Sequence, residues 1–208
     1  MLGTQHLTLF VVSGILLNLT PGQDTLYIVG RSAAQGRRAG ILSVIGIVSG
    51  SVIHTLAAAF GLSAILATSA RAFLVVKFAG AGYLVYLGAR MLLDRSADVA
   101  PAVEFSQDSS WAIYRAGFLT NLLNPKVALF FMAFLPQFVA PTAESRILTF
   151  LFLGGLFICT GTLWCLVLAW GASTMSRRFR ENPSAGAMLK RVTGAVFVGL
   201  GFRLAVSK

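Results

Sequence analysis

The sequence predicts an all-α integral membrane protein with six transmembrane helices, arranged as a 3+3 inverted repeat in which helices 1 and 4 are broken. The chain has 208 residues, of which 56% are hydrophobic and 12% are charged. That share of charge is about half the share found in soluble domains. Several segments without any Asp, Glu, Lys or Arg are long enough to cross a membrane, which takes about 20 residues. Finally, one short motif occurs in each half of the chain and leads into a proline.

The charge-free segments exclude a soluble helical bundle. They run from Met1 to Gln23, from Ala39 to Ala70 and from Ile147 to Ser176. A soluble protein would have to bury such helices on every side, and a chain of this length cannot do so. The net charge of +10 comes from residues at the ends of apolar segments. We therefore expect contact with membrane lipid, and no binding of nucleic acid.

Six spans follow from the apolar segments. They run from about Leu7 to Val29, Gly40 to Leu66, Phe73 to Leu93, Ile113 to Val139, Ile147 to Thr174 and Val192 to Val206. The chain is then one transmembrane transporter domain, 1–208, with repeat one at 1–93, a polar cytoplasmic linker at 94–112 and repeat two at 113–208. Most Lys and Arg residues, including Arg31, lie in or beside the connections after spans 1, 3 and 5. That side should be cytoplasmic, which places both termini outside.

The two halves carry matching segments. The motif Gly-x-Leu-x-Asn-Leu occurs at 14–19 and again at 117–122, and the segment 77–90 resembles 191–203. Each half has an odd number of spans, so the second copy is inverted relative to the first. Inverted repeats with broken helices at matching positions are typical of the binding sites of secondary transporters.

Prolines break the first and fourth spans at Pro21 and Pro125. A proline removes a backbone donor and clashes with the preceding turn, and the carbonyls that it frees need partners in lipid. A simple kink is the alternative. Neighbouring polar side chains could cap the half-helices or bind a zwitterionic ligand. The predicted substrate-binding residues are Asn18, Thr20, Pro21, Gly22, Asp24, Asn121, Asn124, Pro125 and Lys126.

Asp24 is the only acidic residue within a predicted span. Such a carboxylate costs about 2.5–3.5 kcal/mol on insertion scales, so an intramembrane acid indicates a function. We predict that Asp24 carries a proton and binds a substrate ammonium. The alternatives are an ion pair with Lys126, or a position at the cytoplasmic interface, since Arg31 follows seven residues later.

Lys126 and His54 are the other ionisable candidates. Lys126 could bind a substrate carboxylate, pair with Asp24, or extend towards the membrane surface. His54 is the only charged or imidazole side chain in the second span. It is either a neutral side chain bonded to a neighbouring helix, or a second proton-coupling residue beside Asp24.

The remaining polar residues indicate no cofactor. Cys159 and Cys165 are six residues apart, so on a helix they face away from each other. No metal or redox motif and no nucleophile–base pair is found, so we expect no metal, no cofactor beyond a proton gradient, and no enzyme activity. Gly46-x-x-x-Gly50 forms a small-residue face for close helix packing, either within the chain or in a homodimer.

The chain resembles the LysE/RhtB family of amino-acid exporters, which includes threonine, homoserine and leucine exporters. The segments that carry this resemblance are 18–24 (Asn-Leu-Thr-Pro-Gly-Gln-Asp), 30–40, His54, 77–88 and 121–138 (Asn-Leu-Leu-Asn-Pro-Lys, continuing to Phe). They follow the family's order and spacing over nearly the whole chain.

The resemblance implies a bacterial inner-membrane carrier that exports amino acids or their derivatives, driven by proton exchange. Two departures from the family pattern stand out. Gln23 stands where the family often has proline, and the fifth span lacks the acid that some members carry. Coupling would then depend more strongly on Asp24. A cation exporter of the same architecture is the alternative function, although Asp24 alone provides few oxygen ligands.

Overall fold

The computed structural model describes residues 3–64 and 108–174, together with scattered residues between 71 and 93 and between 195 and 206. Regular structure in the described residues is helical, apart from one bridge between Thr4 and Val139. The elements are α1 (Leu7–Leu19), α2 (Gln23–Ala57), the π-helix η1 (Ala58–Leu62), α5 (Ser110–Leu122), α6 (Pro125–Leu129), the π-helix η2 (Phe130–Phe134), the 3-10 helix η3 (Leu135–Phe138) and α7 (Arg146–Thr174). The predicted third and sixth spans lie largely outside the described residues.

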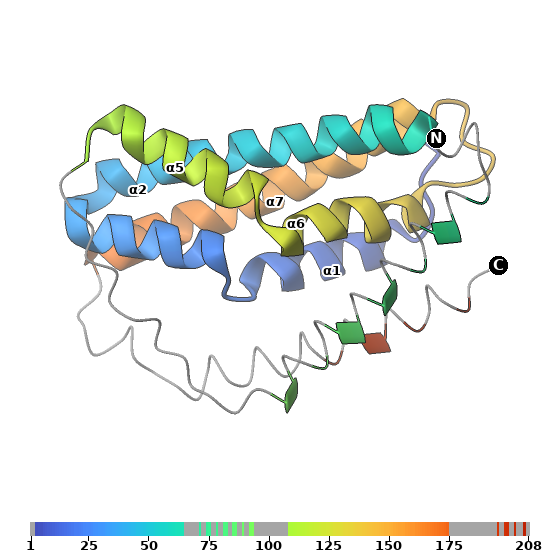
Figure 1. Ribbon diagram of the computed structural model, residues 1–208, viewed down its shortest axis with the longest axis horizontal. Helices are drawn as coiled ribbons and strands as arrows, with labels where there is room; N and C mark the ends of the chain where they lie inside the picture. Colours follow the sequence, from blue (N-terminus) through green and yellow to red (C-terminus); the bar gives the residue numbers. More distant parts are fainter. Residues whose placement is uncertain are drawn as a thin grey trace.

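Helix α2 consists of two limbs that meet at Gly36. Gly36 has a φ of 80° and a ψ of −176°, a conformation that favours glycine. The chain reverses there, at the left end of Figure 1. A Cβ built on Gly40 would lie 2.1 Å from Ser32 Oγ, whereas eight residues of straight helix span about 12 Å. The first limb (23–35) therefore continues α1, and the second limb (37–57) runs back as the predicted second span.

Both predicted helix breaks are present, and each lies near the middle of its helix. Helix α1 has 13 residues before the first break, and the first limb of α2 is of matching length. Helix α5 has 13 residues before the second break, and α6 to η3 continue the path after a bend of 45°. At about 1.5 Å per residue, each half is roughly 20 Å long.

By length and composition, Gln23–Leu62, which includes the turn at Gly36, and Arg146–Ala172 can each cross a membrane. The bent pair Ser110–Leu122 and Pro125–Phe138 makes a third candidate among the described residues. Large apolar side chains on α7 face outwards, including Leu163 at 67% and Val167 at 60% exposure. Such a surface suits lipid rather than water.

Glycines allow α5 to pack closely against the second limb of α2. A Cβ on Gly46 would lie 2.3 Å from the carbonyl oxygen of Tyr114, and one on Gly117 would lie 2.9 Å from that of Ser43. A Cβ on Gly50 would lie 2.7 Å from Asn121 Oδ1. The Gly46/Gly50 face therefore packs within the chain, and this contact brings the second break towards α2.

The two ends of the helix bundle are closed in different ways. At one end, Gly3 and Gln5 pair with the end of η3 and the residues that follow it through main-chain bonds, from Gln5 N to Phe138 O (2.9 Å) and from Ala140 N to Gly3 O (2.8 Å). We call this pairing the N-terminal clasp. It joins the start of the chain to the end of the second broken helix.

Side chains close the opposite end. Arg31 forms an ion pair with Asp108 and donates to Gln35 Oε1, and Tyr27 donates to the carbonyl of Ile113 at 2.8 Å. The prediction that Arg31 lies in a connection between spans is wrong. Arg31 is helical and buried, with 6% exposure, and Gln35 and Asp108 bind its Nη1 and Nη2 groups within the bundle.

Candidate functional site

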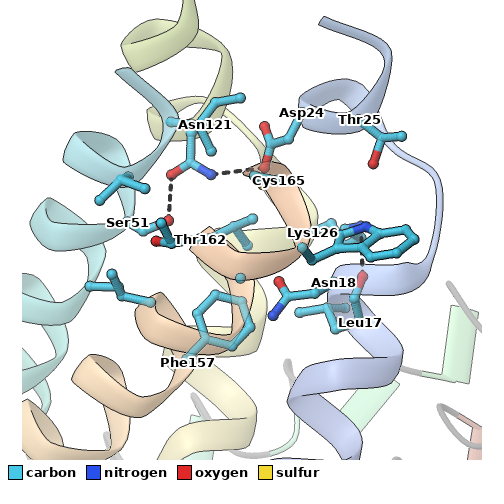
Figure 2. A pocket seen from close by; sticks show the side chains of 16 residues that line it. Leu17, Asn18, Asp24, Thr25, Ser51, Asn121, Lys126, Phe157, Thr162 and Cys165 are labelled. Carbon is cyan, nitrogen blue, oxygen red and sulfur yellow. Dashed lines mark hydrogen bonds between the residues drawn. The ribbon is translucent and has the colours of Figure 1, made fainter. Parts of the chain in front are cut away.

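The two breaks face each other across a small cavity. It is lined by α1, both limbs of α2, α5, α6 and α7, and its polar side chains include Asn18, Asp24, Ser51, Asn121 and Lys126 (Figure 2). Its volume is about 40 Å³. One water needs roughly 10–15 Å³, so the cavity has room for a few waters.

The first break is held by the ammonium group of Lys126. Helix α1 ends at Leu19, and the last carbonyls of a helix have no partner within it. Lys126 Nζ donates to two of these, Leu17 O at 3.2 Å and Thr20 O at 3.1 Å. Gly22 leaves room for this contact, because a Cβ there would lie 3.1 Å from Nζ. The cation also suits the negative end of the helix dipole.

The second break is an N-capped helix start. Asn124 is the N-cap of α6, and its Oδ1 accepts from Lys126 N at 3.0 Å. Pro125 takes the first helical position, where its missing N–H is not needed. This cap places the Lys126 side chain at the start of α6, where it reaches across to α1.

Asp24 lies in the first turn of α2, where the helix dipole favours a carboxylate. Its Oδ2 accepts from Asn121 Nδ2 at 2.8 Å. Asn121 Oδ1 in turn accepts from Ser51 Oγ at 3.1 Å. Figure 2 shows this chain of three side chains on one side of the cavity. The other carboxylate oxygen, Oδ1, is buried without a hydrogen-bond partner among the described residues.

Asp24 and Lys126 line the same cavity. Both are described, and they do not approach within the 4.0 Å of an ion pair. Instead, each charge is held by uncharged groups, Asp24 by an amide and Lys126 by two carbonyls. The internal ion pair that we considered from the sequence is therefore not formed in this structure.

His54 lies beside the second break rather than in the cavity lining. Its Nε2 is 3.2 Å from the carbonyl oxygen of Asn121, and its ring stacks on Phe131 with 5.8 Å between centroids. A carbonyl oxygen only accepts, so Nε2 carries the hydrogen. This is the geometry of a histidine bonded to a neighbouring helix, the first of its two predicted roles.

The predicted substrate-binding residues fall into two groups. Asn18, Asp24, Asn121 and Lys126 line the cavity. The others form the breaks themselves, and Thr20 donates to Leu16 O at 2.7 Å as part of the end of α1. Asn18 Nδ2 is buried without a hydrogen-bond partner among the described residues.

Sequence reasoning did not include several residues that line the cavity. They are Ser51 on α2, and Thr162, Trp164 and Cys165 on α7. Ser51 directly follows the Gly46-x-x-x-Gly50 motif, which was interpreted only as a face for helix packing. The available signal was a cluster of hydrogen-bonding side chains at 160–165 in an otherwise apolar span.

Residues 15–208 match the family of LysE type translocators. The chain belongs to this family. As a LysE type translocator it is a membrane transporter of small solutes and not an enzyme. It is a membrane protein whose described residues are helical apart from one isolated bridge, in agreement with the all-α class that the sequence predicts.

Similar proteins occur in bacteria. This translocator is 31% identical over 202 residues to an uncharacterized membrane protein of Vibrio cholerae, covering 96% of each chain. It is 30% identical over 210 residues to one of Pseudomonas aeruginosa, covering 99% of this chain and 97% of the relative. It is 25% identical over 206 residues to one of Bacillus subtilis, covering 95% and 97%. No solved structure matches this translocator.

Proposed function

We propose that this translocator exports amino acids or amino-acid derivatives across the bacterial inner membrane by proton antiport, with the substrate bound between the two helix breaks. The observation that carries the proposal is the pair of opposite charges in one cavity, Asp24 and Lys126, which are not paired with each other. A zwitterion presents an ammonium and a carboxylate, so it can engage both charges at once.

The present hydrogen-bond partners of Asp24 and Lys126 support binding of a zwitterion. Asp24 Oδ1 is buried without a partner among the described residues, so a substrate ammonium would satisfy it. The carboxylate of the substrate would replace the two carbonyls of α1 as the partner of Lys126 Nζ, because a charged acceptor binds an ammonium more strongly than a carbonyl does. Asn18 Nδ2 provides a further donor beside them.

Substrate entry requires the cavity to widen. At about 40 Å³ the cavity holds only a few waters. Even glycine has more heavy atoms than those waters have oxygen atoms, so it does not fit. When Lys126 leaves the carbonyls of Leu17 and Thr20, the end of α1 loses its link to α6. Substrate binding and separation of the two breaks are then the same event.

A proton on Asp24 gives the direction of transport. The protonated side chain is neutral and holds an ammonium weakly, so a proton that arrives from outside releases the substrate there. The deprotonated side chain then binds the next substrate from the cytoplasm. Between these steps the donors that end on Asp24 Oδ2 are oriented to hydrogen-bond a carboxylate anion.

Contacts between the halves support the proposed inverted repeat. Asn18 of the first motif lies against Gly161 on α7, where a Cβ would be 3.2 Å from Asn18 Oδ1. Asn121 of the second motif lies against Gly50 on α2. Each motif asparagine therefore packs on a glycine in the second span of the other half. We propose six spans arranged in this way, with helices 1 and 4 broken.

The proposed orientation places both termini in the periplasm. Arg31, Arg37 and Arg38 lie on either side of the turn at Gly36, the end of the bundle closed by the Arg31–Asp108 ion pair. The N-terminal clasp lies at the opposite end (Figure 1). A basic end facing the cytoplasm agrees with the usual charge distribution of membrane proteins. A homodimer remains part of the proposal.

Efflux from proteoliposomes tests the function. Vesicles are loaded with radiolabelled threonine, homoserine or leucine, and efflux is measured with and without an inward proton gradient. We expect the gradient to accelerate the efflux of at least one of them. Asp24→Asn should fold and lose this acceleration, while Glu144→Gln, which changes an exposed acid, should keep it.

Two outcomes would contradict the proposal. If Asp24→Asn retains the full response to the proton gradient, Asp24 is not the coupling residue. If divalent cations are carried and no amino acid competes with them, the translocator is a cation exporter.

A further inference from the structure

The hydrogen-bond chain from Ser51 through Asn121 to Asp24 runs in one direction. Ser51 Oγ donates to Asn121 Oδ1, and Asn121 Nδ2 donates to Asp24 Oδ2. Asn121 has 1% exposure and Ser51 has 7%, so bulk water does not replace either contact. Because every donor in the chain points towards Asp24, the arrangement fits a carboxylate anion.

The same three side chains can serve the protonated acid if the chain reverses. A protonated carboxyl group needs an acceptor, and an amide nitrogen cannot accept. Rotation of the Asn121 amide by half a turn would place its Oδ1 beside Asp24 and its Nδ2 beside Ser51. The hydroxyl of Ser51 can accept as well as donate, so both contacts survive with their directions exchanged.

We infer that Asn121 and Ser51 are positioning residues for proton coupling, and that the Asn121 amide reverses when Asp24 gains a proton. This inference rests on the proposed function, in which Asp24 carries the proton. Asn121 then acts on the substrate through Asp24, because both ends of its amide are already bonded. Asn18, in the matching motif, has a free Nδ2 among the described residues and is better placed for direct contact with the substrate.

The surroundings of Asn121 permit this rotation and link it to the second break. Gly50 presents no side chain to the amide, where a Cβ would lie 2.7 Å from Oδ1. The backbone carbonyl of Asn121 is fixed by His54 Nε2 and by the N–H of Asn124. The side chain can therefore turn while its backbone stays tied to the break at 123–124.

The effect of the hydrogen-bond chain on Asp24 has to be distinguished from the effects of other ionisable groups nearby. In the described part of the molecule, Lys126 on α6 and Cys165 on α7 line the same cavity, and His54 reaches the Asn121 carbonyl. Helix α1 has no ionisable side chain, and Tyr114 and Arg115 lie about two turns before Asn121 on α5. Tyr27, three residues after Asp24, donates to the carbonyl of Ile113. None of these groups contacts Ser51 Oγ. A substitution at Ser51 therefore changes the hydrogen-bond chain to Asp24 without removing a contact of another ionisable group.

The test is the pH dependence of efflux in Ser51→Ala, with Ser49→Ala as the matched control. Ser49 is on the same helix, and among the described residues its hydroxyl bonds only to Ile45 O. The Ser51 hydroxyl polarises the Asn121 amide that donates to the Asp24 carboxylate, and the bond to a charged acceptor is the stronger one, so loss of Ser51 weakens the contact of the anion more than that of the acid. We expect the midpoint of the profile to move to higher pH by about 0.5–1 unit in Ser51→Ala. Ser51→Thr, which keeps the hydroxyl, should restore it.

Infrared difference spectroscopy on the same proteins measures the protonation of Asp24 without transport. The carboxyl band that disappears in Asp24→Asn should titrate at higher pH in Ser51→Ala than in Ser49→Ala. Equal midpoints in both variants, by efflux and by infrared, would overturn the inference. Such a result would leave the proposed function intact, which fails instead if Asp24→Asn keeps its proton response.

Discussion

Replacing Gly46 with alanine tests whether close packing of α5 on α2 holds the site together. The new Cβ would lie 2.3 Å from the carbonyl oxygen of Tyr114 and 2.8 Å from the backbone nitrogen of Phe118. Ordinary contacts begin near 3.4 Å, so the helices would have to move apart by about 1 Å. The obstacle is backbone, which cannot rotate out of the way.

The expected change in the free energy of unfolding follows from two opposing effects. Overpacking costs about 1–3 kcal/mol, and alanine in place of glycine returns up to about 1 kcal/mol of helix propensity. We expect a net loss of about 1–2 kcal/mol. Efflux should fall as well, because the contacts of Asn121 with Ser51 and Asp24, at 3.1 and 2.8 Å, do not tolerate an extra 1 Å.

Thermal unfolding in detergent, followed by size-exclusion chromatography of a fluorescent fusion, measures the change. Gly155→Ala on α7 is the matched control, because no atom of another described element lies within 4 Å of its added Cβ. It should be as stable as the parent protein or slightly more stable. Equal melting temperatures for Gly46→Ala and Gly155→Ala would refute the packing argument.

Three further predictions address the breaks, the cytoplasmic end and the cavity. Asn124→Ala removes the N-cap of α6 and should lower stability in the same unfolding assay by about 1 kcal/mol; no change would show that the cap is dispensable. A double-mutant cycle of Arg31→Gln and Asp108→Asn should give a coupling energy of about 1 kcal/mol, since the Asp108 side chain is 34% exposed; additive effects would contradict this. In a Cys159→Ser background, an exported amino acid should slow maleimide labelling of Cys165, which lines the cavity; labelling that does not depend on substrate would place the substrate elsewhere.

The helix breaks were predictable because proline chemistry is local. Pro125 with Asn124 before it has the sequence of an N-capped helix start. Thr20-Pro21-Gly22 ends one helix and permits another. The approximate ends of the second broken helix (110–138) and of α7 (146–174) followed in the same way, from where apolar segments stop.

The partners of the charged residues were not predictable, because they depend on how distant helices are placed. The spacing of Asp24 and Lys126 from their prolines does not reveal whether the two side chains meet. In the structure Lys126 extends to the carbonyls of α1, and Asn121 occupies the position next to Asp24. The single-residue turn at Gly36 was also missed, since polar residues around it indicated a longer connection.

The N-terminal clasp makes one end of the translocator insensitive to most point mutations. Its bonds join main-chain atoms, so substitutions at Thr4 or Val139 leave them in place. Gly3 is the exception, because a Cβ there would lie 2.5 Å from Ala143 Cβ. The opposite end is joined through the side chains of Tyr27 and Arg31, where one substitution removes a contact. Point mutations that accumulate in evolution should therefore alter the contacts at the Tyr27/Arg31 end. The end with the N-terminal clasp should change only when an insertion or deletion shifts the main-chain pairing.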